Sequence, residues 1–332
     1  MTKIPRIVTI GGGTGSYVAL IGLKKYDVKL TAVVNMIDSG GSSGKLRDEL
    51  GVLPPGDIRQ CLVALAASPK LLRDMFNYRF TEGGLKGHNF GNIFLSTLEK
   101  NTGSMKKAIS EVGKILRIRG TVAPITFSKC DLCVELADGK VIEGETHIDE
   151  VEKAEHRAKI VRAFLQPKAE INEDAARAIE EADFIIIGPG DLYTSIIPNI
   201  LVDDAAQAVR DSKAKKIFVL NLMTKYGQTT DYTAKQHLED LEKYLGNGVL
   251  DYVLVNTKTP RKETLDWYEE YQESVVKDDL EDSDSFKIIR KNLIKDLLFK
   301  NSEADNLRRS IVRHDPDKLA AEIMEIIQGG SK

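Results

Sequence analysis

Residues 4–15 read Ile-Pro-Arg-Ile-Val-Thr-Ile-Gly-Gly-Gly-Thr-Gly, an apolar run that leads directly into a turn of glycines. Ile7, Val8 and Ile10 are typical of a strand that is covered on both faces. Residues 16–25 continue with the apolar spacing of a helix. A strand, a glycine turn and a helix N-terminus together present backbone N–H groups and a positive dipole end, which suits a phosphate. The alternative is a tight turn that binds nothing, and the glycine cluster alone leaves both open.

This glycine pattern differs from two familiar nucleotide-binding motifs. Gly11, Gly13 and Ser16 make Gly-x-Gly-x-x-Ser, whereas the dinucleotide fingerprint ends in glycine or alanine. No Lys-Ser/Thr pair closes the turn as in a Walker loop. The candidate ligand-binding residues of this turn are Gly11, Gly12, Gly13, Thr14 and Gly15.

The composition excludes several classes of protein. The chain has 332 residues, 42% of them apolar, which is ample for the core of one large or two ordinary domains. A formal net charge of −3 argues against a general nucleic-acid or membrane-surface binder. No apolar stretch approaches the ~20 residues of a spanning helix, and the first six residues do not resemble a signal peptide. We therefore expect a cytoplasmic protein that neither binds nucleic acid nor inserts into a membrane.

The cysteines do not predict a metal site. Cys130 and Cys133 are the only close pair, and they fall in an expected strand, where an odd separation sends two side chains to opposite faces. No second pair completes a zinc site. We expect these residues to serve packing and the protein to bind no metal.

A second polar loop follows the next expected strand, residues 29–38. Asp38 lies 38 − 15 = 23 positions after Gly15, close to where dinucleotide-binding units place an acidic residue that holds ribose hydroxyls. The glycine-serine run that follows is not part of that fingerprint, and its hydroxyls and N–H groups suit a phosphate or a sugar equally well. The candidates in this loop are Asp38, Ser39, Gly41, Ser42 and Ser43.

Two further polar segments precede expected helices. In Leu-Pro-Pro-Gly-Asp-Ile-Arg (residues 53–59), Asp57 is either a helix N-cap or a carboxylate that faces a ligand, and Arg59 is suited to a phosphate. In Gly-His-Asn-Phe-Gly-Asn (residues 87–92), His88 is a candidate because it lies between glycines at a helix start. The remaining candidates of this segment are Asn89 and Asn92.

The middle of the chain changes character. From about residue 118 to 148 the segments alternate and are rich in β-branched residues, and Asp138-Gly139 is a strong hairpin signal. We expect an antiparallel β insertion here, which would serve as an edge or an oligomer contact and not for chemistry.

Three more expected strands end in polar or glycine clusters. They cover residues 184–187, 216–220 and 251–255. A helix over residues 172–181 precedes the first of them. The side chains after these strands suit sugar, phosphate or base contacts, although a rigid Pro-Gly turn is the alternative for residues 188–190. The candidates are Gly190, Tyr193, Thr194, Ser195, Asn221, Thr224 and Asn256.

Together these segments predict an α/β fold, namely a Rossmann-like, mostly parallel sheet with helices on both faces. The polar clusters then share the carboxyl edge of the sheet, where such sheets bind ligands. We expect residues 1–258 to form this core, including the β insertion. Residues 259–332, acidic at first and then ending in a helix from Asp315-Pro316, are expected to form a C-terminal helical appendage that packs on the core.

These motifs resemble those of the YvcK family of gluconeogenesis factors, which is related to the CofD family of 2-phospho-L-lactate transferases. The matching segments are Ile-Gly-Gly-Gly-Thr-Gly (10–15), Gly-Gly-Ser-Ser-Gly (40–44), Leu-Pro-Pro-Gly-Asp-Ile-Arg (53–59), Gly-His-x-x-Gly-Asn (87–92), Gly-Pro-Gly-x-Leu-Tyr-Thr-Ser (188–195) and Asn-Leu-Met-Thr (221–224). Their order is kept over about 250 residues, which makes the resemblance specific.

The resemblance implies a protein that binds nucleotide sugars such as UDP-N-acetylglucosamine. It further implies a regulatory role in carbon metabolism, cell shape and peptidoglycan precursor supply, without an established turnover reaction. The CofD relatives instead join a nucleotide-activated phospholactate or phosphoenolpyruvate to a deazaflavin, and Asp57 resembles the carboxylate on their acceptor side. Two departures stand out: Ser39 replaces the usual second aspartate before Gly-Gly-Ser-Ser-Gly, and residues 89–90 read Asn-Phe instead of Ser-Leu.

The sequence therefore supports three hypotheses. The first is a regulator that binds a nucleotide sugar, with the diphosphate on the first glycine loop and on Ser42 and Ser43. The second is a transferase with Asp57, Asp38 and His88 near the reacting oxygen, for which Mg²⁺ would be the cofactor. The third is an interaction protein that docks a regulatory partner, with the ligand only shifting its conformation. We also expect a homo-oligomer.

Overall fold

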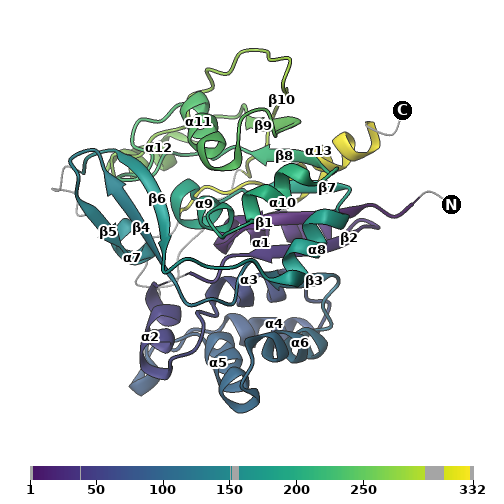
Figure 1. The fold of residues 1–332 in the computed structure, drawn as a ribbon, viewed down its shortest axis with the longest axis vertical. Helices are drawn as coiled ribbons and strands as arrows, with labels where there is room; N and C mark the ends of the chain where they lie inside the picture. Colours follow the sequence, from purple (N-terminus) through teal and green to yellow (C-terminus); the bar gives the residue numbers. More distant parts are fainter. Residues whose placement is uncertain (1–2, 38, 150, 152–156, 296–309, 330–332) are drawn as a thin grey trace.

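The computed structural model describes residues 3–37, 39–149, 151, 157–295 and 310–329 (Figure 1). Seven strands form a parallel sheet in the order β10-β9-β8-β7-β1-β2-β3. The strand order reverses between β1 and β7, which is the switch point at which such sheets bind ligands. These strands are β1 (Arg6–Gly11), β2 (Lys29–Val34), β3 (Thr121–Pro124), β7 (Phe184–Ile187), β8 (Lys215–Val219), β9 (Tyr252–Asn256) and β10 (Lys287–Lys291).

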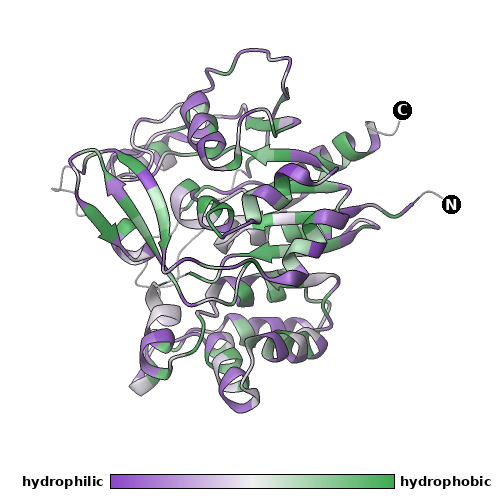
Figure 2. Cartoon of the chain, viewed as in Figure 1, coloured by the Kyte–Doolittle hydropathy of each residue, from purple (hydrophilic) through white to green (hydrophobic). Residues whose placement is uncertain are grey.

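Strand β1 is central because its side chains enter both halves of the core. Ile7 packs with the helices on one face of the sheet, whereas Val8 and Ile10 pack with those on the other face. All three are at most 2% exposed, as expected of a strand covered on both sides. Figure 2 shows the same arrangement, with hydrophobic strands inside and more hydrophilic helices around them. The predicted Rossmann-like fold is therefore confirmed.

Two groups of helices cover the sheet. On the Ile7 face lie α1 (Gly13–Leu23), α3 (Gly56–Leu65) and α13 (Pro316–Gly329). On the Val8 face lie α8 (Glu173–Glu181), α9 (Ile197–Ile200), α10 (Ala205–Asp211) and α11 (Ala234–Leu245). Asn172 caps α8 by accepting from the amide of Asp174, so the predicted helix over residues 172–181 is confirmed.

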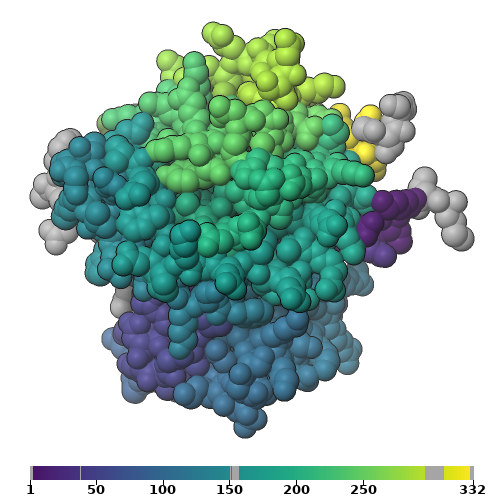
Figure 3. All heavy atoms as spheres, viewed as in Figure 1, coloured from purple at the N-terminus to yellow at the C-terminus, as the bar shows by residue number. Residues whose placement is uncertain are grey.

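The long connection from β2 to β3 is helical. It contains α2 (Gly41–Leu50), α3, α4 (Lys70–Asn77), η1 (Gly83–Leu85), α5 (Phe90–Thr102) and α6 (Met105–Leu116). Apart from α3, these helices make up the lower part of the molecule in Figures 1 and 3. The connection thus brings two further helix N-termini, those of α2 and α3, back to the carboxyl edge of the sheet.

The antiparallel insertion is a separate sheet in the order β5-β4-β6, with β4 (Asp131–Leu136), β5 (Val141–Glu143) and β6 (Ile160–Gln166). The amide of Gly139 donates to the carbonyl of Leu136, which confirms the hairpin predicted at Asp138-Gly139. The expected bounds of residues 118–148 differ from this sheet. Residues 121–124 are the edge strand β3 of the main sheet, and the third insertion strand, β6, comes later in the chain.

The C-terminal part of the chain contributes to the main sheet as well as packing on it. Beyond the expected boundary at residue 258, the chain forms α12 (Lys262–Glu269) and then β10, which pairs with β9 in parallel. Leu319 and Ile323 of α13 are fully buried against the Ile7 face. The expected helical appendage is present as α13, but strand β10 belongs to the sheet. The expected C-terminal segment, residues 259–332, lies partly outside the described residues.

No helix among the described residues is long and apolar enough to cross a membrane.

Candidate functional site

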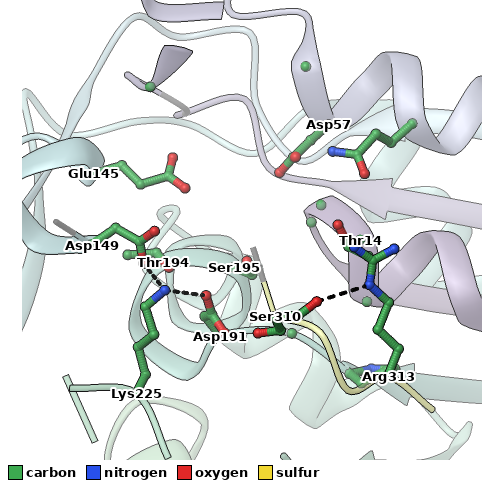
Figure 4. Close-up of a pocket in the computed structure, with 18 of the residues that line it drawn as sticks. Thr14, Asp57, Glu145, Asp149, Asp191, Thr194, Ser195, Lys225, Ser310 and Arg313 are labelled. Carbon is green, nitrogen blue, oxygen red and sulfur yellow. Dashed lines mark hydrogen bonds and ion pairs between the residues drawn. The ribbon is translucent and has the colours of Figure 1, made fainter. Parts of the chain in front are cut away.

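A pocket of about 190 Å³ opens at the switch point of the sheet (Figure 4). Its walls come from loops that follow β1, β2, β7 and β8, and these loops are brought together because parallel strands share one carboxyl edge. Helix α7 (Glu145–Asp149) of the insertion and residues 310–314 complete the walls. The clustering of polar segments at this edge, which the strand pattern predicts, is thus observed for four strands.

Three helices begin at this pocket without a side-chain cap. The N-cap residues are Gly12 for α1, Gly40 for α2 and Pro55 for α3, and none of them supplies a capping hydrogen bond from a side chain. Asn89, Ser104, Asn172 and Thr233 cap α5, α6, α8 and α11, whereas α4, α10 and α12 also lack a side-chain cap and do not begin at the pocket. Helix N-termini carry N–H groups that need acceptors, so three such ends around one cavity have the geometry and dipole direction that suit an anion.

Most of the predicted ligand-binding residues line this pocket. They come from six separate segments of the sequence, and the fold brings them together. The predicted residues in the walls are Gly12, Gly13, Thr14, Gly15, Ser42, Ser43, Asp57, Arg59, Asn92, Gly190, Thr194, Ser195, Asn221 and Thr224.

Asp57 lies in the first turn of α3 and faces the first glycine loop. It is not the N-cap residue, which is Pro55, so the capping role considered for Asp57 is wrong. A Cβ atom on Gly12 would lie only 2.2 Å from Asp57 Oδ2, which shows how closely the carboxylate approaches this loop. The sequence leaves capping and ligand-facing roles open, and the position of the carboxylate favours the second.

Arg59 is a rigid cation at the wall of the pocket. It is 9% exposed, and its guanidinium donates to Asn92 Oδ1 (2.9 Å) and Asn77 Oδ1 (2.7 Å). Asn92 in turn donates to Ser43 Oγ at 3.4 Å. These bonds orient the guanidinium before any ligand binds, and an oriented guanidinium suits phosphate recognition.

Several predicted residues lie behind the wall and act on residues within it. His88 Nδ1 is 3.4 Å from Ser42 Oγ, and the amide of Asn89 donates to the same oxygen at 3.1 Å. Ser39 Oγ accepts from the amide of Thr146 in α7 at 3.2 Å. Gly11 ends β1 and Gly41 begins α2, and neither lines the pocket. His88 contacts Ser42 and is not among the residues that line the pocket, and its contact with a ligand stays a prediction.

Two predictions place a side chain in the wrong surroundings. Tyr193 is fully buried, and its hydroxyl donates to Asp240 Oδ2 at 2.6 Å. Its side chain therefore points into the core and not into the pocket. Asn256 follows β9, and its side chain bonds the backbone of Lys258 and Leu293 instead of lining the pocket. The predicted position Asp38 lies outside the described residues.

An acidic wall faces the glycine loops, and the sequence patterns do not predict it (Figure 4). It consists of Glu145 and Asp149 from α7 and Asp191 from the loop after β7. Lys225 Nζ lies among them, 3.2 Å from Asp149 Oδ1 and 4.0 Å from Asp191 Oδ2. The only signal for Asp191 is its place in the Gly-Pro-Gly-Asp loop, and the α7 residues belong to a segment that gives no binding signal.

Residues 310–314 form the last wall, and the sequence patterns do not predict it. Tyr268 Oη accepts the amides of Ile311 (3.1 Å) and Val312 (3.2 Å), and this anchors the segment beside the pocket. Arg313 and Thr14 both line the pocket and are labelled in Figure 4. Burial lowers the pKa of His314 to about 4, although a hydrogen bond to the backbone of Leu220 partly offsets this, so the imidazole is neutral at pH 7. Among the described residues, no group of three or more His, Cys, Asp or Glu side chains could hold a metal ion.

The comparisons agree with this architecture. The sequence profile of the CofD family, described as 2-phospho-L-lactate transferase CofD, matches residues 7–294. The chain belongs to the CofD family. Within it, the gluconeogenesis factor of Bacillus subtilis is 38% identical over 330 residues, covering 99% of this chain and 100% of that protein. The gluconeogenesis factor of Halalkalibacterium halodurans is 38% identical over 325 residues, covering 97% of each chain.

A further CofD-family relative and a solved structure extend this result. A protein from Nostoc is 44% identical over 324 residues, which cover 97% of this chain and 68% of that protein. A crystal structure of a UPF0052 family member from Bacillus halodurans has a TM-score of 0.87 at 35% identity, covering 98% of this chain and 100% of that chain. The predicted resemblance to gluconeogenesis factors and CofD proteins is confirmed.

Proposed function

We propose that this CofD-family protein binds a nucleotide sugar, of which UDP-N-acetylglucosamine is the test case, in the switch-point pocket. The observation that carries the proposal is the convergence of the uncapped N-termini of α1, α2 and α3 on one cavity. A diphosphate would supply acceptors for their N–H groups and complement their dipoles. Hydroxyls of Thr14, Ser42 and Ser43 and the guanidinium of Arg59 support the same anion.

The rest of the pocket suits a sugar or nucleoside. Carboxylates accept hydrogen bonds from hydroxyl groups, and Glu145, Asp149 and Asp191 lie across the cavity from the glycine loops. Asn221 and Thr224 are candidates for ribose or base contacts. Asn221 Oδ1 is buried without a partner among the described residues, while its amide nitrogen donates to the carbonyl of Gly190 at 2.7 Å.

The names of the relatives suggest the cellular role. Proteins that are 38% identical over nearly the whole chain are called gluconeogenesis factors. We propose that this protein likewise acts in gluconeogenic growth, as a cytoplasmic regulator linked to cell shape and peptidoglycan precursor supply. A regulatory protein partner and a homo-oligomeric state belong to the same proposal.

Titration calorimetry tests the binding step. The wild-type protein is expected to bind UDP-N-acetylglucosamine with a Kd below the millimolar range. Ser43→Ala, which removes a hydroxyl from the pocket wall, is expected to weaken binding about threefold to tenfold. Ser96→Ala is the matched control because Ser96 is fully buried and does not line the pocket. Absence of binding by the wild type at millimolar ligand would overturn the proposal.

A transferase is the second candidate, favoured by the family profile and by Asp57 in the pocket. In this case a nucleotide-activated phospholactate or phosphoenolpyruvate is joined to a deazaflavin, and Mg²⁺ would stabilise charge on the phosphate oxygens. The test is Mg²⁺-dependent release of a nucleoside monophosphate when donor and acceptor are both present. Turnover that survives Asp57→Ala would count against a catalytic role for this carboxylate.

A further inference from the structure

The wall segment η2 (Leu192–Ile196) is a π-helical turn. The carbonyl of Asp191 accepts from the amide of Ser195, four residues later, at 2.9 Å and from that of Ile196, five residues later, at 3.1 Å. The α-helical and π-helical hydrogen bonds thus share one acceptor. Such turns are rare, and they are frequent at functional sites. The contacts that η2 makes with the rest of the protein are therefore of interest for the shape of the pocket wall.

The two sides of η2 have different surroundings. Thr194 and Ser195 line the pocket, as does Asp191 one turn earlier. Tyr193 points the other way, is 0% exposed and donates its hydroxyl to Asp240 Oδ2 at 2.6 Å. Thr194 and Ser195 follow Asp191 by three and four residues and so share its face of the turn. Tyr193 follows Asp191 by two residues and lies on the opposite face.

Asp240 belongs to α11, which also contacts the insertion sheet. Its Oδ2 atom accepts a second hydroxyl, that of Tyr232, at 2.7 Å. Four residues along α11, Tyr244 Oη accepts the amide of Ala163 in β6 at 2.8 Å. Burial, with Tyr232 and Asp240 nearby, raises the pKa of Tyr193 far above its usual range, so its hydroxyl remains a donor at physiological pH.

We infer that Tyr193 and Asp240 are positioning residues for the ligand pocket: their hydrogen bond holds η2 so that Thr194 and Ser195 face the ligand. The inference rests on the proposed nucleotide-sugar function. Neither side chain lines the pocket, so each acts through the turn and not by contact with a ligand.

The structure offers a matched pair of variants. Tyr193→Phe and Tyr232→Phe each remove one hydroxyl from the same carboxylate oxygen, but only Tyr193 belongs to η2. Both are expected to lower the melting temperature by a similar few degrees. In titration with UDP-N-acetylglucosamine, Tyr193→Phe is expected to raise Kd about fivefold to tenfold, and Tyr232→Phe less than about twofold.

A double-mutant cycle of ligand affinities separates a positioning role from a loss of stability alone. Ser195→Ala is expected to cost less affinity in the Tyr193→Phe background than in the wild type, because the turn no longer presents Ser195 correctly. If Tyr193→Phe does not fold, Asp240→Asn, which keeps one acceptor oxygen, is measured in its place with the same expected direction.

The outcomes separate this inference from the function on which it rests. Equal changes in Kd for the two phenylalanine variants, or an unchanged Kd for Tyr193→Phe, would overturn the positioning role while wild-type binding still supports the proposed function. Absence of binding by the wild type would overturn both.

Discussion

At the scale of single residues, a Cβ atom on Gly12 would clash with the carboxylate of Asp57, from which it would lie only 2.2 Å away. Gly12 has φ −154°, which any residue adopts, so contact and not backbone strain excludes a Cβ atom. We predict that Gly12→Ala turns the Asp57 carboxylate out of place and raises the Kd for nucleotide sugar at least about tenfold. The free energy of unfolding should change by less than ~1 kcal/mol, because a side-chain end can rotate away.

Calorimetry and urea denaturation of the same preparation check this prediction. Gly84→Ala is the control, since nothing lies within 4 Å of a Cβ atom at Gly84. Unchanged affinity in Gly12→Ala would mean that the position of Asp57 does not matter for binding.

A Cβ atom at Gly15 would meet backbone atoms instead of a side-chain end, so we expect a different outcome from a substitution there. A Cβ atom there would lie 2.0 Å from the carbonyl oxygen of Pro189, which is backbone and cannot rotate aside. We predict that Gly15→Ala separates α1 from the loop after β7 and lowers the free energy of unfolding by more than ~2 kcal/mol. Urea denaturation measures the loss, and a midpoint equal to that of Gly84→Ala would contradict it.

At the scale of helices, side-chain caps are present at some N-termini and absent from others. Ser104 caps α6 by accepting from the amide of Lys107 at 3.3 Å, whereas α1, α2 and α3, which begin at the pocket, have no side-chain cap. We predict that Ser104→Ala costs about 1 kcal/mol of stability and leaves ligand affinity unchanged. Thermal unfolding and calorimetry test both parts. A loss of affinity would show that α6 also shapes the site.

The strands of the main sheet show which elements the sequence patterns predict and which they do not. Strand β7 coincides with the predicted residues 184–187, because four consecutive apolar residues that end in Gly-Pro-Gly have few other solutions. The sequence pattern predicts β3 as part of the insertion, because its apolar residues suit either sheet. Only the pairing of β3 with β2 shows that it belongs to the main sheet. No sequence pattern predicts β10, because it follows an acidic segment and pairs with a strand that ends more than 30 residues earlier.

At the scale of the whole molecule, stability should fall in mild acid. His314 is 5% exposed, and burial lowers its pKa to about 4 from an ordinary value of about 6.5. Between these pH values the unfolded chain binds a proton that the folded protein does not, so stability decreases as pH falls through this window. The depressed pKa corresponds to a loss of roughly 3 kcal/mol by pH 4.

Urea denaturation between pH 7 and pH 4 measures this loss for the wild type and for His314→Gln. The variant should flatten the pH dependence, because it lacks the buried imidazole. An identical pH dependence in His314→Gln and the wild type would show that other groups are responsible.

Local patterns predict the parallel sheet, the glycine turn after its central strand and the family, because apolar runs and Gly-rich strand ends can be recognised without the fold. They also predict most of the pocket, since parallel strands share one carboxyl edge. Tertiary contacts, in contrast, place Tyr193 against Asp240 and out of the pocket lining, and they bring α7 and residues 310–314 to the walls. Those features depend on contacts between segments distant in the chain, which no local pattern records.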